Sequence, residues 1–166
     1  MIIERAGLCL RTDFLQTRRR PKTTGVFITS TLTDQRQCLD ANAFDVMDAA
    51  LHKFGVGFHY LVLPDGKIQI CRHPLSVSSY GPDRLRETHI AIAWVGGRDG
   101  DTGEFRKQDV TPAQHQAIEE LIQMLADTLQ VPLEVEDGND LFDEIENEET
   151  IEEIHQEKLD AAELTS

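Results

Sequence analysis

Six histidines and three cysteines are the side chains of this 166-residue sequence best suited to metal binding or nucleophilic catalysis. The cysteines, Cys9, Cys38 and Cys71, lack the C-x-x-C spacing of zinc and redox sites. No serine lies in a G-x-S-x-G nucleophile elbow. The histidines are dispersed along the chain: His52, His59, His73, His89, His115 and His155. The pattern favours small buried thiols and hydrogen-bonded histidines over a metal centre.

Charge divides the sequence into two parts. The chain carries 30 acidic and 16 basic side chains, a formal net charge of −14. Residues 131–166 hold 14 acidic residues and one basic residue, which gives −13, and residues 1–130 hold 16 and 15, which gives −1. We therefore expect a domain over 1–130 and an acidic tail, disordered or partly helical, over 131–166. This acidity argues against direct binding of nucleic acid.

The N-terminal residues and the lengths of the apolar runs indicate in which cellular compartment the protein is expected. Glu4 and Arg5 interrupt the apolar residues at the start of the chain, which is unlike a secretory signal. No apolar run reaches the roughly 18 residues of a membrane-spanning helix. We expect a cytoplasmic protein with reduced thiols and no membrane span.

Hydrophobic patterning predicts an α/β fold, a mixed central sheet with helices packed on it. Strands are expected over residues 2–10, 24–30, 58–63, 67–71 and 89–95, and helices over 40–54 and 112–129. The turn Pro64-Asp65-Gly66 between two apolar runs predicts a β-hairpin. Thr111 before Pro112 predicts a helix start. We expect residues 76–87 to form a loop.

Three motifs occur in an order typical of one family. They are Gly57-Phe58-His59-Tyr60-Leu61-Val62 with Asp65-Gly66, then Ile90-Ala91-Ile92-Ala93-Trp94-Val95-Gly96-Gly97, then Thr111-Pro112-Ala113-Gln114. Together they resemble the type-2 N-acetylmuramoyl-L-alanine amidases, the family that includes the peptidoglycan-recognition proteins. Within it, the pattern is most similar to small bacteriophage lysozyme-amidases that also inhibit the phage RNA polymerase. The resemblance covers about residues 25–129 and implies an amidase-like fold.

The resemblance implies zinc-assisted hydrolysis only if the metal ligands are present. The family uses two histidines and a cysteine, with a tyrosine near the metal. Thr29 stands at the first histidine position, and residues 131–150 contain neither the second histidine nor the cysteine. Phe58 replaces the tyrosine, and Ser78-Ser79-Tyr80-Gly81 replaces the family's G-x-H-A. We therefore predict no catalytic residue, no metal ligand and no cofactor, although zinc is expected for the family.

We favour a catalytically inactive, amidase-like protein that binds and modulates a protein partner, such as an RNA polymerase or another host or phage enzyme. The acidic tail, through Asp140, Asp143 and Glu144, would engage a basic channel of that partner. Solubilising the chain is an equally simple role for the tail.

The short basic run Arg18-Arg19-Arg20 is most simply a solvated turn. It is also a candidate site for an acidic partner or for the tail of this chain.

Two alternatives differ in what the fold retains. A non-hydrolytic binder of peptidoglycan fragments would line its groove with Thr29, Phe58 and Tyr80. An active amidase would need a non-standard metal site; a meeting of His73 and His89 near Cys71 is conceivable, although no motif indicates it. The active amidase predicts stoichiometric zinc, whereas the non-hydrolytic binder predicts none.

Overall fold

The computed structural model describes residues 1–5, 18–50 and 56–139. Some residues named above lie outside the described residues: Cys9, His52, Asp140, Asp143, Glu144 and His155. None of the described helices is long and apolar enough to cross a membrane.

A six-stranded mixed sheet forms the centre of the fold, with strand order β1-β4-β3-β5-β2-β6. Its strands are β1 (Ile3–Arg5), β2 (Gly25–Ser30), β3 (Tyr60–Val62), β4 (Ile68–Ile70), β5 (His89–Trp94) and β6 (Glu134–Asp137). Only the β3–β4 pair is antiparallel, and the other four strand pairs are parallel. The predicted α/β class and hairpin are confirmed.

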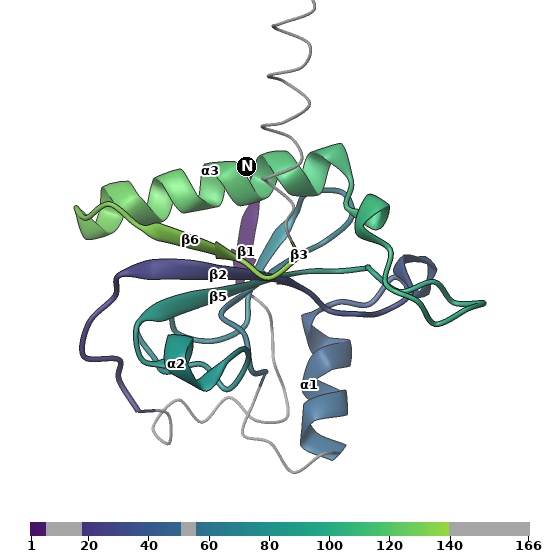
Figure 1. Cartoon of the computed structure of the whole chain (residues 1–166), viewed down its shortest axis with the longest axis horizontal. Coiled ribbons are helices and arrows are strands. Elements are labelled where there is room, and N and C mark those ends of the chain that lie inside the picture. Colours follow the sequence, from purple (N-terminus) through teal and green to yellow (C-terminus); the bar gives the residue numbers. More distant parts are fainter. Residues whose placement is uncertain (6–17, 51–55, 140–166) are drawn as a thin grey trace, which may run out of the picture.

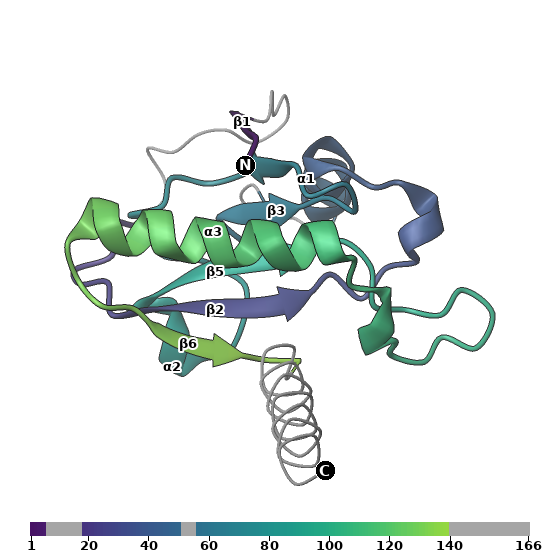
Figure 2. The same cartoon turned by 90° about the horizontal axis from the view of Figure 1, so that it is seen from above.

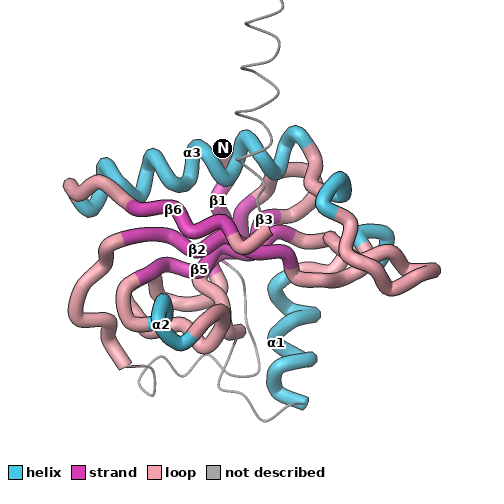
Figure 3. The backbone as a smooth tube through the Cα atoms, viewed as in Figure 1, coloured by secondary structure: helices cyan, strands magenta, loops and turns pink. Residues whose placement is uncertain are grey.

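Helices cover both faces of this sheet. The helix α3 (Pro112–Leu129) lies along one face, and α1 (Ala41–Ala50) and the short α2 (Asp83–Arg86) lie on the other (Figure 1). Two 3₁₀ turns, η2 (Gln35–Gln37) and η3 (Lys107–Asp109), lie in the connections after β2 and β5. Figure 3 shows that much of the remaining chain is loop.

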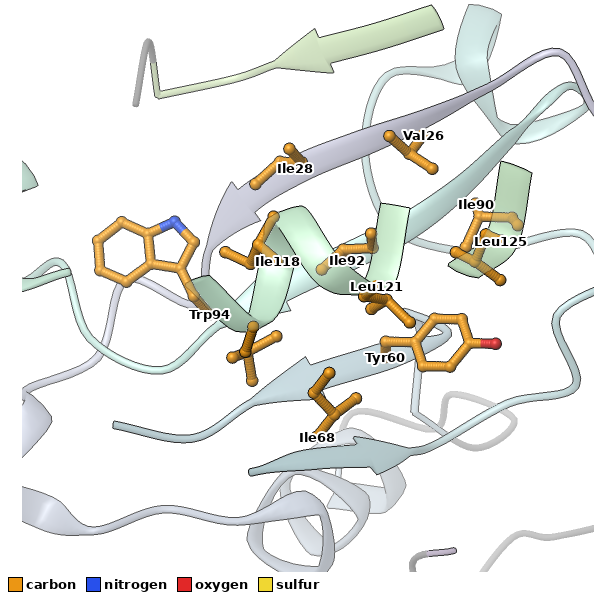
Figure 4. Close-up of a cluster of buried hydrophobic side chains, with 12 residues drawn as sticks. Val26, Ile28, Tyr60, Ile68, Ile90, Ile92, Trp94, Ile118, Leu121 and Leu125 are labelled. Carbon is orange, nitrogen blue, oxygen red and sulfur yellow. The ribbon is translucent and has the colours of Figure 1, made fainter. Parts of the chain in front are cut away.

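The main core lies between α3 and the sheet. Alternate residues of β2 and β5 point into it, since side chains along a strand alternate between its two faces. The helix contributes Ile118, Leu121 and Leu125 (Figure 4). All six residues of β5 are buried because this strand is covered on both faces.

The start of α3 is fixed by a capping box. The Thr111 hydroxyl accepts a hydrogen bond from the Gln114 backbone N–H at 3.0 Å, and the Gln114 side chain accepts one from the Thr111 N–H. The buried Gln114 amide also donates to the carbonyls of Val62 at 3.1 Å and Val95 at 2.9 Å. The predicted helix start is confirmed, and it is tied directly to the ends of β3 and β5.

The predicted boundary at residue 130 is wrong. The strand β6 lies beyond it and pairs with β2 from Gly25↔Glu134 to Ile28↔Asp137. The sequence did not indicate this strand because its residues are mostly acidic. Charged residues are tolerated there because β6 lies at the exposed edge of the sheet. The loop predicted over 76–87 is also only partly correct, since it contains the single helical turn α2.

We predict that a chain ending at Gln130 is less stable than a chain ending at Asn139 by about 3 kcal/mol or more. The shorter chain loses the backbone bonds of β6 and the packing of Leu133 on the core. Urea unfolding followed by circular dichroism measures the difference. Equal stability of the two truncated chains would contradict the place of β6 in the domain.

Candidate functional site

The candidate site lies at the C-terminal end of β2, on the sheet face opposite α3. Thr29 is half-buried there and pairs in register with Ala93 of β5. Its hydroxyl donates to the carbonyl of Ser30 at 3.3 Å. The position predicted from the resemblance therefore carries a hydroxyl that already has an acceptor in its own strand.

An aromatic cluster lies on the same face. Phe58 is 3% exposed, and its ring makes edge-on contacts with Phe44 and Tyr80, with centroids 5.5 Å apart in both pairs. The Tyr80 hydroxyl donates to the Ser30 carbonyl at 3.5 Å. The structure thus brings Thr29, Phe58 and Tyr80 to one end of β2. Because Phe58 is buried, it supports Tyr80 and is itself shielded from a ligand.

Two glycines and a phenylalanine that the sequence did not single out complete this end of the sheet. The Phe27 ring lies between Gly81 and Gly138, where an added Cβ would come within 2.8 Å and 3.1 Å of it, respectively. The Gly138 N–H donates to Ile28 at 2.9 Å, and the Asn139 side chain accepts from the Ser30 N–H at 2.6 Å. No local pattern indicates these contacts, because they join segments more than 50 residues apart.

The residues at this end of β2 do not fit a zinc ion. Thr29 offers a neutral hydroxyl, and the adjacent Gly138 has no side chain. Within the described part of the chain, no three histidine, cysteine or acidic side chains lie together as a metal site would require. His73, His89 and Cys71 are therefore not brought together as such a site.

The two described cysteines differ in their surroundings. Cys71 is buried, as predicted, and its burial raises the pKa of the thiol well above its ordinary range. Cys38 is exposed, so its prediction as a buried hydrophobe is wrong. It ends η2 in a left-handed conformation, with φ of 51°, at the surface.

Comparisons of sequence find no relative: no family model matches the chain, and no curated protein is similar to it. Solved structures do match. The amidase LysC from Clostridium intestinale gives a TM-score of 0.64 at 17% identity, over 85% of this chain and 85% of that one. The bumblebee peptidoglycan recognition protein PGRP-SA gives 0.64 at 12% identity, over 84% of each chain. A mutant of Drosophila PGRP-LB in complex with tracheal cytotoxin gives 0.62 at 11% identity, over 84% and 83%.

This chain has the fold of the N-acetylmuramoyl-L-alanine amidases and the peptidoglycan recognition proteins. The amidase-like fold implied by the three sequence motifs is confirmed.

In this amidase fold, a buried histidine and a buried arginine hold the loop that leads to Tyr80. His59 accepts from the Ala91 N–H at 2.9 Å through Nδ1 and donates to the Ser76 carbonyl at 2.7 Å through Nε2. Burial lowers the pKa of His59 to about 3, so the ring is neutral. The prediction of a hydrogen-bonded histidine is confirmed for His59.

The prediction of Arg20 as a solvated, partner-binding residue is wrong. Arg20 is 3% exposed and donates to the Thr23 hydroxyl, to the Pro74 carbonyl at 2.6 Å and to the Ser76 carbonyl at 2.9 Å. Burial lowers the pKa of its guanidinium to about 10. Arg18 and Arg19 are exposed, and Arg18 forms an ion pair with Glu87. Five donors in a rigid fork suit Arg20 to several carbonyls at once.

We predict that Arg20→Ala lowers the free energy of unfolding by about 2–3 kcal/mol, since it leaves buried acceptors without their donor. Arg19→Ala, the matched exposed neighbour, should change it by less than about 0.5 kcal/mol. Urea unfolding of both variants measures the contrast. Similar small losses in both would show that the bonds of Arg20 contribute little.

His59 should make stability depend on pH. Its folded pKa of about 3 lies below the ordinary value of 6.5, so the unfolded chain binds a proton that the folded chain excludes. The stabilisation is complete above about pH 6.5 and is lost as pH falls toward 3, with a slope of about 1.4 kcal/mol per pH unit between them. His59→Gln should remove that part of the slope in urea unfolding from pH 7 to 4. An unchanged slope would show that His59 titrates normally.

Proposed function

We propose that this protein is a non-hydrolytic binding protein built on the amidase fold, and that it acts by binding and modulating a protein partner. The arrangement of residues at the C-terminal end of β2 supports the first part of the proposal, that the protein does not hydrolyse peptidoglycan. Among the described residues, no three histidine, cysteine or acidic side chains lie together as a metal site requires, and the Phe27 ring packs against Gly138 at the end of β2. A zinc hydrolase needs three protein ligands and an open position for water.

Exposed apolar side chains support a protein as the partner. Val46 and Met47 of α1 are 56% and 45% exposed, and Leu32 and Phe105, in the loops after β2 and β5, are 53% and 45% exposed. Exposed apolar side chains that form a contiguous patch mark interaction surfaces, and Val46 and Met47 are neighbours on α1. The net charge of −14 would steer the chain toward a basic surface. An RNA polymerase, with its basic nucleic-acid channel, is the partner class to test first.

A peptidoglycan fragment is the second candidate ligand. The hydroxyls of Thr29 and Tyr80 lie on one sheet face with the half-buried ring of Phe27. Hydroxyls beside an aromatic ring suit a sugar or a short peptide. One structure with the same fold, Drosophila PGRP-LB, is in complex with tracheal cytotoxin. Thermal stabilisation by a soluble muropeptide, lost in Tyr80→Phe, would favour this candidate.

We predict well below one zinc per chain when the full protein, purified without chelator or metal-affinity resin, is measured by elemental mass spectrometry. The donor set at Thr29 gives no reason for tight binding. Amidase activity on peptidoglycan should likewise be absent. One tightly held zinc with hydrolysis would overturn the non-hydrolytic proposal.

The protein-partner part has its own test. Full-length protein should bind a purified RNA polymerase and reduce transcription from it, whereas muropeptide should leave its melting temperature unchanged. Stabilisation by muropeptide without polymerase binding would replace the first candidate by the second.

A further inference from the structure

The strand β6 forms an open edge of the sheet, and Figure 2 shows it as the outermost strand beside β2. The Glu134 N–H donates to the Thr24 carbonyl at 3.0 Å, and the Gly138 N–H donates to the Ile28 carbonyl at 2.9 Å. Successive residues of a strand point their backbone groups to opposite sides, so Val135 directs its N–H and carbonyl away from β2. Within the described ranges, no further strand pairs with that side. Such an edge can accept an added strand.

The two faces of β6 differ in chemistry. Val135 pairs in register with Val26, which is buried against α3, so Val135 lies on the α3 face of the sheet and is 47% exposed there. Glu134 and Glu136 alternate with it and lie on the opposite face, the side of α1 and α2. Residues directly opposite each other on neighbouring strands share a face. An added strand would therefore meet an apolar side chain on one face and carboxylates on the other.

The carboxylate face of β6 carries polar groups that lack a basic partner. Glu136 forms an ion pair with Arg84 of α2 at 3.4 Å, whereas Glu134 makes none among the described residues. His89 is 5% exposed, and its Nε2 has no hydrogen-bond partner in the same part of the chain. A Cβ added at Gly25 would come within 2.7 Å of that Nε2 and 2.5 Å of the Glu134 carbonyl. The His89 ring therefore lies across β2, toward β6.

The state of the His89 ring indicates which side chain suits this face. Burial lowers the pKa of His89 against the opposing effect of Glu136 and Glu134, so the ring is neutral near pH 7. Its Nδ1 is hydrogen-bonded with the Thr88 hydroxyl at 2.7 Å. With the ring proton on Nδ1, Nε2 is an acceptor, as is the Glu134 carboxylate. A lysine or arginine side chain, which carries only donors, suits both acceptors.

A second copy of this chain does not suit the edge. Antiparallel pairing of two β6 strands about Val135 would place Glu134 of each copy opposite Glu136 of the other. Like charges directly opposite each other destabilise a strand pair. The charge of the edge thus disfavours self-association and favours a basic segment.

We propose that β6 is the docking edge for an extended segment of a partner protein in which basic and apolar residues alternate. The segment adds as a further strand, with its backbone bonded to Val135. Its lysine or arginine side chains lie on the face of Glu134 and His89, and its apolar side chains lie on the face of Val135. This inference rests on the proposed protein-binding function and names the surface and the chemistry of its partner.

The test measures binding of the full chain to a fluorescent peptide, Lys-Val-Lys-Val-Lys with uncharged ends, by fluorescence anisotropy. Val135→Pro removes the outward N–H and keeps the bonds of β6 to β2, since an edge strand tolerates proline where its N–H faces solvent. It should weaken binding about tenfold or more. The matched control Val135→Ile keeps the N–H and the apolar contact, and should change binding less than about threefold.

Two further measurements separate backbone pairing from charge. The same peptide, N-methylated at each residue, keeps its charge but loses its backbone donors, and should bind about tenfold more weakly or worse. Glu134→Lys should weaken binding of the basic peptide about fivefold or more and strengthen binding of Glu-Val-Glu-Val-Glu. The matched control Asp101→Lys makes the same charge change in the loop after β5 and should alter neither by more than about twofold.

Weaker binding in Val135→Pro and for the N-methylated peptide, with the reversal in Glu134→Lys, supports the inference. Equal binding by Val135→Pro, equal binding of the N-methylated peptide, or no binding of the plain peptide overturns the docking edge. An unchanged response to Glu134→Lys overturns the basic chemistry of the partner. If circular dichroism shows that Val135→Pro is unfolded, the N-methylated peptide decides on the unchanged protein. Binding to RNA polymerase is measured separately, so the proposed function can stand where the β6 edge fails.

Discussion

The pairing of β2 with strands on both of its edges is the constraint on which the site depends. Six residue pairs with β5 fix its register, and β6 occupies the other edge. A buried strand needs both edges bonded, since its backbone groups have no water to bind. Gly25 allows the close approach, because a Cβ there would meet the His89 ring and the carbonyl of Glu134. This pairing fixes the positions of Thr29, Gly138 and Asn139, the last residue before the acidic C-terminal segment.

The two faces of β2 carry separate requirements. Val26 and Ile28 are fully buried against α3, so their size and apolarity are set by packing. Phe27 and Thr29 point to the other face and are only half-buried. A change of chemistry at Thr29 therefore leaves the main core intact. This separation explains how the amidase fold can be complete while its metal ligands are not found among the described residues.

Local signals in the sequence predicted the elements whose contacts are near in sequence. The Pro64-Asp65-Gly66 turn and the Thr111 cap act within a few residues, and both were confirmed. The strand β6 was missed because its partner lies more than 100 residues away and its own residues are charged. Arg20 was missed for a similar reason: three adjacent arginines look alike, and only the fold determines which one reaches Pro74 and Ser76.

The candidate site shows the same division. The resemblance predicted that Thr29, Phe58 and Tyr80 belong together, and the structure places them at one end of β2. It could not predict that Phe44 covers Phe58, or that Phe27 lies between two glycines, because these packing relations join distant segments. The identities of the residues at the family's ligand positions were enough to predict that the zinc ligands are missing. Which side chains of the site face solvent depends on packing between distant segments, which the sequence does not show.

Leu32 has a backbone conformation that is unfavourable for stability, with φ of 54°. A left-handed conformation costs a leucine about 1–2 kcal/mol, and glycine or asparagine would avoid most of that cost. Leu32 is 53% exposed, so burial of its side chain offsets only part of that cost. The surrounding hydrogen bonds nevertheless hold this conformation in place. An apolar side chain held outward on a fixed backbone would lose little entropy if a partner covered it, so the protein-binding function proposed above would give a physical reason for a leucine at this position.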